Sequence, residues 1–168
     1  MDQVRSNFDF LDRLDGKLAN FGRLAESYFQ EDPSTSLIKL RQFGERLARR
    51  HALLMSVDLV DADTQVDLLR RLKYDRAAPD RVLDVLHHIR KLGNAAVHDG
   101  QGDHRQALAC LKMSVQLGVW HIRASTRDRE FSPGPFVPPC APQTSTNELT
   151  EELERLRRER DDALTAVQ

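Results

Sequence analysis

Three polar side chains, Arg90, Asn94 and His98, recur at intervals of four residues in the middle of the chain. On a helix that turns by about 100° per residue, this spacing places them in a row on one face, with His87 nearby. A guanidinium group binds phosphate, and an imidazole exchanges protons near neutral pH. The row therefore fits metal-independent cleavage of RNA, in which Arg90 would hold the phosphate and His98 would act as acid or base.

The same row also fits a structural role, because amides and imidazoles inside a protein commonly bond to neighbouring elements. Gly93, Ala95 and Ala96 lie between the polar positions, and such small residues let a second helix approach closely. We therefore expect Asn94 and His98 to be buried organisers of helix packing, and we assign no catalytic residue to this chain.

Other reactive residue types form weaker patterns. The candidate metal ligands are His87, His88, His98, Asp99, Asp103 and His104. They match no recognised metal-binding spacing. Cys110 lies in an apolar stretch and is interpreted as a small core residue, and it forms no CxxC pair with Cys140. We expect no metal and no cofactor in this chain.

Basic residues are concentrated in two stretches. The first contains Lys39, Arg41, Arg46, Arg49 and Arg50, and the second contains Arg70, Arg71, Lys73 and Arg76. Such clusters contact phosphates in nucleic-acid-binding proteins, although interspersed acids also suit an ordinary solvated surface. Aromatic residues do not alternate with the basic ones, so a stacking platform for single strands is not predicted. The residues that we take as candidate contacts with DNA or a partner protein are Arg41, Arg46, Arg49, Arg50 and Arg90.

The composition limits the class of protein. In 168 residues, 25 Lys and Arg face 26 Asp and Glu, so no overall positive field attracts a polyanion and any nucleic-acid contact must be local. Hydrophobic residues make up 40% and aromatics only 6%, which indicates one helical domain with an appendage. The start of the chain lacks an apolar leader, and no stretch approaches the roughly 20 apolar residues that span a bilayer. With two cysteines far apart, we expect a reduced, cytoplasmic protein without membrane contacts.

Apolar periodicity predicts an all-α fold, a single bundle of about five helices. The apolar pattern over residues 7–29 predicts one continuous helix. The signals that begin the following helices are Asp32-Pro33, Thr64 with Asp67, Pro79, and Asp103 with Gln106. Gly100 should end the fourth helix. The fifth, from residue 104 to about 127, is apolar on more than one side, so we expect it to be the central, most buried helix.

The composition changes after residue 127. Five prolines fall between Pro133 and Pro142, which excludes helix and central strand and predicts a linker over residues 128–144. We expect Phe131, Phe136 and Val137 to dock on the bundle of residues 1–127, because a solvated tether needs no large apolar groups.

Residues 145–168 alternate acids and bases and predict a charged helix, which Ser145 and Glu148 would cap. A heptad pattern begins with Leu149, Leu153 and Leu156 but does not continue, so the sequence does not predict a stable coiled coil. The amphipathic pattern is still incomplete at Gln168. We therefore expect a longer polypeptide to follow.

Three stretches carry a resemblance to a known family. They are SYFQEDPSTSLIKLRQFGERLA (Ser27 to Ala48), IRKLGNAAVHDGQGDHRQALACLK (Ile89 to Lys112) and FSPGPFVPP (Phe131 to Pro139). In this order they resemble the helical N-terminal domain of R-subunit-like proteins of type I restriction systems and of related DEAD/DEAH-box helicases. The resemblance implies a following superfamily 2 ATPase motor, which would bind ATP and Mg²⁺ and make the parent protein an ATP-dependent helicase and endonuclease.

The helical domain also resembles the HEPN superfamily, whose ribonuclease members use an Arg, a polar residue and a His spaced R-N-x-x-x-H. Asn94 and His98 match the polar and histidine positions, whereas Gly93 occupies the arginine position. Arg90 lies one turn earlier and is the only nearby substitute. The departure implies a degenerate site, because the arginine would hold the scissile phosphate.

These observations favour a non-catalytic recognition and assembly domain at the front of a restriction-type DNA translocase. Its expected partners are the motor region of the same polypeptide, DNA and other subunits of the restriction system. One alternative is a HEPN-type metal-independent ribonuclease that uses His98, Asn94 and Arg90. Another is a pure oligomerisation domain that forms a homodimer.

Overall fold

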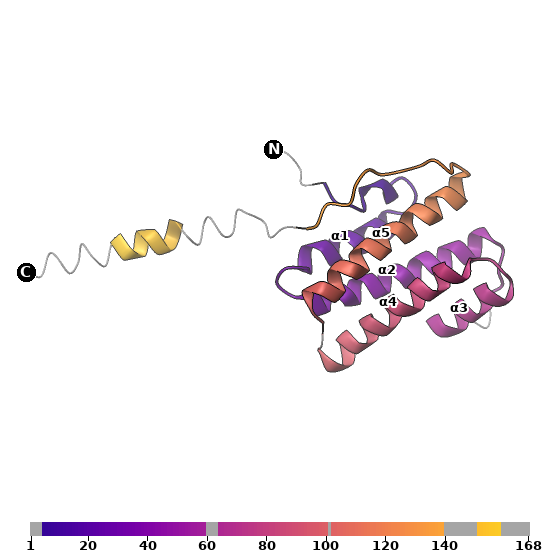
Figure 1. The fold of residues 1–168 in the computed structure, drawn as a ribbon, viewed down its shortest axis with the longest axis horizontal. Helices are drawn as coiled ribbons and strands as arrows, with labels where there is room; N and C mark the ends of the chain where they lie inside the picture. The colour runs from indigo at the N-terminus through magenta and orange to yellow at the C-terminus, as the bar shows by residue number, and fades with distance from the viewer. Residues whose placement is uncertain (1–4, 60–63, 101, 140–150, 159–168) are drawn as a thin grey trace, which may run out of the picture.

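The computed structural model of the chain describes residues 5–59, 64–100, 102–139 and 151–158. The elements in these ranges are the 3₁₀ helix η1 (Asp9–Leu11) and the α-helices α1 (Gly16–Tyr28), α2 (Pro33–Leu54), α3 (Gln65–Tyr74), α4 (Asp80–Asp99) and α5 (His104–Thr126). Residues 151–158 are also helical. No strand occurs among the described residues, so the predicted all-α helical bundle is confirmed (Figure 1).

Helix α2 is the centre of the bundle, because it packs against α1, α3, α4 and α5 (Figure 1). Its largest fully buried side chains are Leu37, Leu40, Phe43 and Leu47. The prediction that α5 is the central helix is wrong. Met113 and Trp120 on α5 are only partly buried, because they face the surface beside residues 131–139, which we call the Pro-rich segment.

Local capping signals begin the helices where the sequence predicts. The side-chain oxygens of Asp32, Thr64 and Asp103 each accept a backbone N–H from the first turn of α2, α3 and α5. Pro79 precedes α4, and Gly100 ends it in the left-handed conformation, with φ of 59°. These contacts satisfy backbone groups that a helix leaves unpaired at its ends, which explains why the sequence signals were sufficient.

The predicted continuous helix over residues 7–29 is wrong, because Asp15 interrupts it. Asp15 has an extended backbone and its carboxylate accepts the N–H groups of Lys17 and Leu18, which starts α1 anew. The chain before it folds back so that the ring of Phe8 lies over Gly22, where a Cβ would approach the ring to 2.2 Å. Capping and this close contact therefore override the apolar periodicity.

The Pro-rich segment lies along the bundle through Pro139. Phe131 and Phe136 pack against the core, as predicted, and the Arg123 guanidinium donates two hydrogen bonds to the carbonyl of Phe131. The side chain of Asn7 pairs with both backbone groups of Val137, at 2.7 and 2.8 Å. The Val137 side chain, however, remains 63% exposed, so its predicted docking is wrong and the main chain makes the contact instead.

Residues 151–158 form a short charged helix in which Leu153 and Leu156 are exposed. The predicted capping pair Ser145 and Glu148 lies outside the described residues, as do Cys140 and the last part of the predicted linker. No described helix combines the length and hydropathy that crossing a membrane requires.

Candidate functional site

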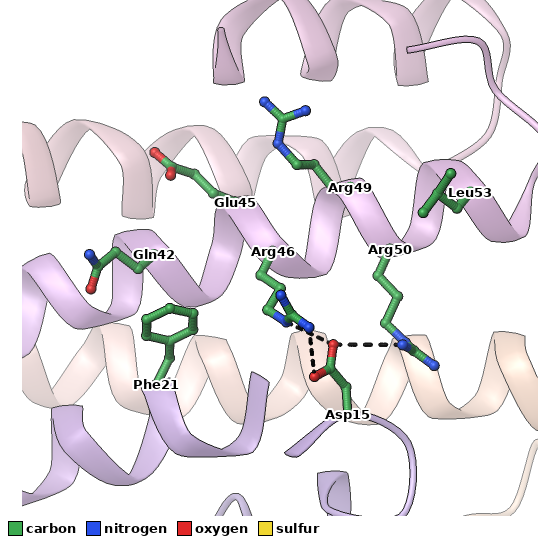
Figure 2. A pocket seen from close by; sticks show the side chains of 8 residues that line it. All are labelled: Asp15, Phe21, Gln42, Glu45, Arg46, Arg49, Arg50 and Leu53. Atoms are coloured by element: carbon green, nitrogen blue, oxygen red, sulfur yellow. Dashed lines mark hydrogen bonds and ion pairs between the residues drawn. The ribbon is translucent and has the colours of Figure 1, made fainter. Parts of the chain in front are cut away.

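A concave surface of about 430 Å³ lies along one side of α2, at the start of α1 (Figure 2). Its lining residues are Asp15, Phe21, Gln42, Glu45, Arg46, Arg49, Arg50 and Leu53. We call this surface the basic pocket. It brings together three of the five arginines that the sequence selects as contacts, namely Arg46, Arg49 and Arg50.

Asp15 lies between two of these arginines. The Arg46 guanidinium donates to both carboxylate oxygens of Asp15, at 2.8 and 3.0 Å, and Arg50 Nη1 lies 3.6 Å from Oδ2. The Asp15 side chain is only 6% exposed. Burial acts to raise its pKa, but hydrogen bonds from Arg46 and from the Leu18 N–H, with the charges of Arg46 and Arg50, hold the pKa below its ordinary value. One carboxylate thus caps α1 and fixes two guanidinium groups.

Arg49 behaves differently from its two neighbours. Figure 2 shows its guanidinium pointing away from Asp15, and the side chain is exposed. No carboxylate among the described residues pairs with it. The basic pocket therefore holds three guanidinium groups against the two carboxylates of Asp15 and Glu45, and Arg49 carries the cation that is not neutralised internally.

Arg41 crosses from α2 to the polar row on α4. Its Nη1 donates to Asn94 Oδ1 at 2.8 Å, and its Nε lies 3.7 Å from Glu45 Oε1. The stem of Arg41 lies over Gly93, where a Cβ would be only 2.5 Å from the Arg41 Cβ. Gly93 therefore leaves room for a guanidinium from another helix to reach Asn94. This explains the close helix approach that the small residues of α4 predict.

His98 is exposed, so the prediction that it is a buried organiser is wrong. The face of α4 that meets α2 carries Ile89, Gly93 and Ala96, which are all buried. His98 lies two residues beyond Ala96, which rotates it by roughly 200° from that face. Arg90 is half-buried, and of the predicted row Asn94 is the member bonded across the helix interface.

Two of the residues considered as metal ligands have structural roles. Asp103 caps α5, and His104 Nε2 lies 2.7 Å from the carbonyl of Gln30. Among the described residues, no three His, Cys, Asp or Glu side chains gather closely enough to hold a metal ion. Cys110 is buried, which raises the pKa of its thiol to about 12 and keeps it protonated, as expected of a core residue.

The second basic stretch lies on and after α3. Arg70 and Arg71 lie near the carboxylates of Asp67 and Asp75 on their own helix, at 3.7 and 3.8 Å. Lys73 and Arg76 line a shallow hollow before α4. This stretch is not part of the basic pocket, so the structure separates the two clusters that look alike in sequence.

A buried pair of histidines, His51 and His121, is a site that the sequence does not reveal as a pair. Their Nδ1 atoms lie 3.2 Å apart, and His51 Nε2 lies 2.9 Å from the carbonyl of Ala77. Burial lowers the pKa of both histidines, so both rings are neutral near pH 7. His51 then donates to that carbonyl, and its Nδ1 accepts from the Nδ1–H of His121. The only sequence signal is that each histidine falls on an apolar face, which does not identify its partner.

The fold and the site define an all-α bundle domain with a basic concave surface along its central helix. The family profile described as "Domain of unknown function (DUF4145)" matches residues 23–119, and the chain belongs to this family. The chain is also 37% identical over 135 residues to a protein of Escherichia coli (strain K12), the type I restriction enzyme EcoKI endonuclease subunit. The match covers 80% of this chain but only 11% of that subunit. No solved structure shows significant similarity.

Proposed function

We propose that this chain is a non-catalytic recognition and assembly domain of a type I restriction system, which contacts DNA or partner subunits through the basic pocket. Similarity to an endonuclease subunit of such a system supports the restriction role. The rest of the proposed parent protein would supply an ATP- and Mg²⁺-dependent motor, and this domain would supply binding. Arg41 and Arg90 do not line the basic pocket and are further candidate contacts.

The observation that carries the proposal is the arrangement of Arg46, Arg49 and Arg50. Asp15 holds Arg46 and Arg50 in place before any ligand arrives, which reduces the conformational entropy lost on binding. Arg49 is free to make the first contact. Guanidinium groups bind phosphate oxygens in a bidentate manner, and such contacts position a protein on a duplex without reading its sequence.

Replacing Arg49 with glutamine tests the proposal with duplex DNA. We expect weaker binding, and the slope of log affinity against log salt should fall by about 1, because one phosphate contact is lost. Fluorescence anisotropy at several salt concentrations measures both quantities. The matched control is Arg70→Gln on α3, whose side chain is 76% exposed and lies outside the basic pocket. Equal affinity and slope in the two variants would contradict a role for the pocket in DNA binding.

A ribonuclease is the second candidate function, and one observation favours it. Arg41 brings a guanidinium to Asn94, beside the position where Gly93 replaces the arginine of the HEPN pattern. Against it, the Arg41 guanidinium is already bonded to Asn94 and lies beside Glu45, and His98 stands apart on the exposed side of α4.

Incubation of the protein with labelled RNA separates the two functions. We expect no cleavage above that in buffer, because a phosphate would have to displace Asn94 from Arg41. Cleavage that disappears in both His98→Ala and Arg41→Ala, with the helical content unchanged, would replace the binding proposal by the nuclease. A stable dimer in light scattering with no DNA shift in a gel would instead favour the oligomerisation domain.

A further inference from the structure

A second concave surface, about 680 Å³ in volume, lies between the first half of α4, the outer side of α5 and the Pro-rich segment. We call it the α4–α5 groove. Its floor is apolar and includes Val85, Met113, Trp120 and Phe136. Trp120 and Met113 are only partly buried, so the groove leaves large apolar side chains in contact with water. Such surfaces commonly mark interaction sites.

Cations surround the groove. Arg81, Lys112 and Arg123 line it, and no carboxylate is among its lining residues. Lys112 lies 5.9 Å from the centre of the Phe136 ring, and Arg123 is bonded to the carbonyl of Phe131. The groove therefore combines an apolar floor with positive charge held at its margin, which complements an amphipathic segment that carries acids beside its apolar side chains.

Such a segment follows the Pro-rich segment in the same chain. Residues 151–156 carry Glu151, Glu152 and Glu154 and one base, Arg155, which lies 3.1 Å from Glu152. Leu153 and Leu156 are 55% and 50% exposed in the helical residues 151–158. A helix this short is marginal in water unless a surface covers its apolar side. Its exposed leucines match the apolar floor of the α4–α5 groove, and its acids match the cations at the margin.

We propose that residues 151–156 dock in the α4–α5 groove of their own chain, with Leu153 and Leu156 on the apolar floor and the glutamates beside Arg81, Lys112 and Arg123. The connection is long enough. Phe136 already lies in the groove, and a stretch of eleven residues, 140–150, can span up to about 38 Å when extended. A tether of this length gives the segment an effective concentration in the millimolar range, which favours a weak contact within one chain.

Trp120 is the single tryptophan of the chain and lines the groove, so its fluorescence reports the docking. The double variant Leu153→Ser with Leu156→Ser, made in the full chain, should shift Trp120 emission to longer wavelength and make it easier to quench with acrylamide. High salt should cause part of the same shift in the unaltered chain, because screening weakens the charge pairing. Arg157→Ser, on the same helix, is the matched control and should leave the emission unchanged.

Arg81→Glu provides an independent variant on the bundle side, because Arg81 is exposed and its loss does not disturb the core. It should reproduce the shift of the leucine variant, and combining the two should add nothing further. Unchanged emission and quenching in the leucine variant, with the bundle still folded by circular dichroism, would overturn the proposal. A shift that depends on protein concentration would also overturn it, because the occupant would then be a second copy.

Discussion

Replacing Gly93 with alanine is expected to lower the free energy of unfolding by about 1–3 kcal/mol, as overpacking of a tight interface does. Alanine is the better helix former, so local propensity alone predicts the opposite sign. The new Cβ would lie 2.5 Å from the Arg41 Cβ, an atom next to the backbone of α2 that cannot swing away. The helices must separate, and the Arg41–Asn94 hydrogen bond is strained. Urea unfolding followed by circular dichroism measures the change.

Gly44→Ala is the matched control, because Gly44 also lies in the middle of a helix at the α2–α4 interface. There the added Cβ would meet Leu86 and Ile89 at 3.5 and 3.9 Å, which is ordinary contact. The control should therefore raise stability by up to about 1 kcal/mol through helix propensity. If both glycine variants were stabilised, the close approach of Arg41 to Gly93 would not be a constraint in solution.

Lowering the pH from 6.5 to 4 is expected to remove on the order of 3 kcal/mol of stability through the buried histidine pair. Burial, with the charges of His51 and Arg50, lowers the pKa of His121 from 6.5 to about 4, and burial also lowers the pKa of His51. Because the folded pKa lies below the unfolded one, the unfolded chain binds the proton first as the pH falls. The stability is therefore complete above pH 6.5 and is lost towards pH 4.

Unfolding curves across this range, in the unaltered chain and in His121→Gln, measure the effect. The variant removes the titrating group and should flatten the profile, whereas His98→Gln, at an exposed histidine, should preserve it. The carboxylates of Asp15 and Asp32 have pKa values lowered from 3.8. The stability that these carboxylates give the folded state is therefore lost at a lower pH than the stability that depends on the histidine pair. A profile in His121→Gln with the same slope as the unaltered chain would contradict the assignment to the histidine pair.

The positions of most helix ends followed from the sequence, because the interactions that fix them are local. Asp32 accepts the N–H of Thr35, Thr64 that of Asp67 and Asp103 that of Gln106, each within three residues. The exception is Asp15. The apolar periodicity continues across it, and the break depends on the cap that its carboxylate forms, on Arg46 and on the contact of Phe8 with Gly22.

The candidate site depended more heavily on tertiary structure. The sequence selected Arg46, Arg49 and Arg50, but it gave no sign that Asp15 holds two of them and leaves the third free. In the sequence, Gly93 stands where the HEPN pattern has an arginine, and it is one of the small residues that predict a close helix approach. In the fold it is the space through which Arg41 reaches Asn94, a contact across 53 positions that spacing along one helix does not reveal.

By itself, the sequence determined the helical class, the starts of α2, α3, α4 and α5 and the docking of Phe131 and Phe136, because capping bonds, helical periodicity and proline geometry act over a few residues. Only the tertiary structure decided that α2 is central, that His98 faces solvent and that His51 meets His121 inside the core. Each of these depends on how one helix is rotated against another. That rotation is set by packing among residues far apart in the chain, which a periodic pattern constrains only to a face.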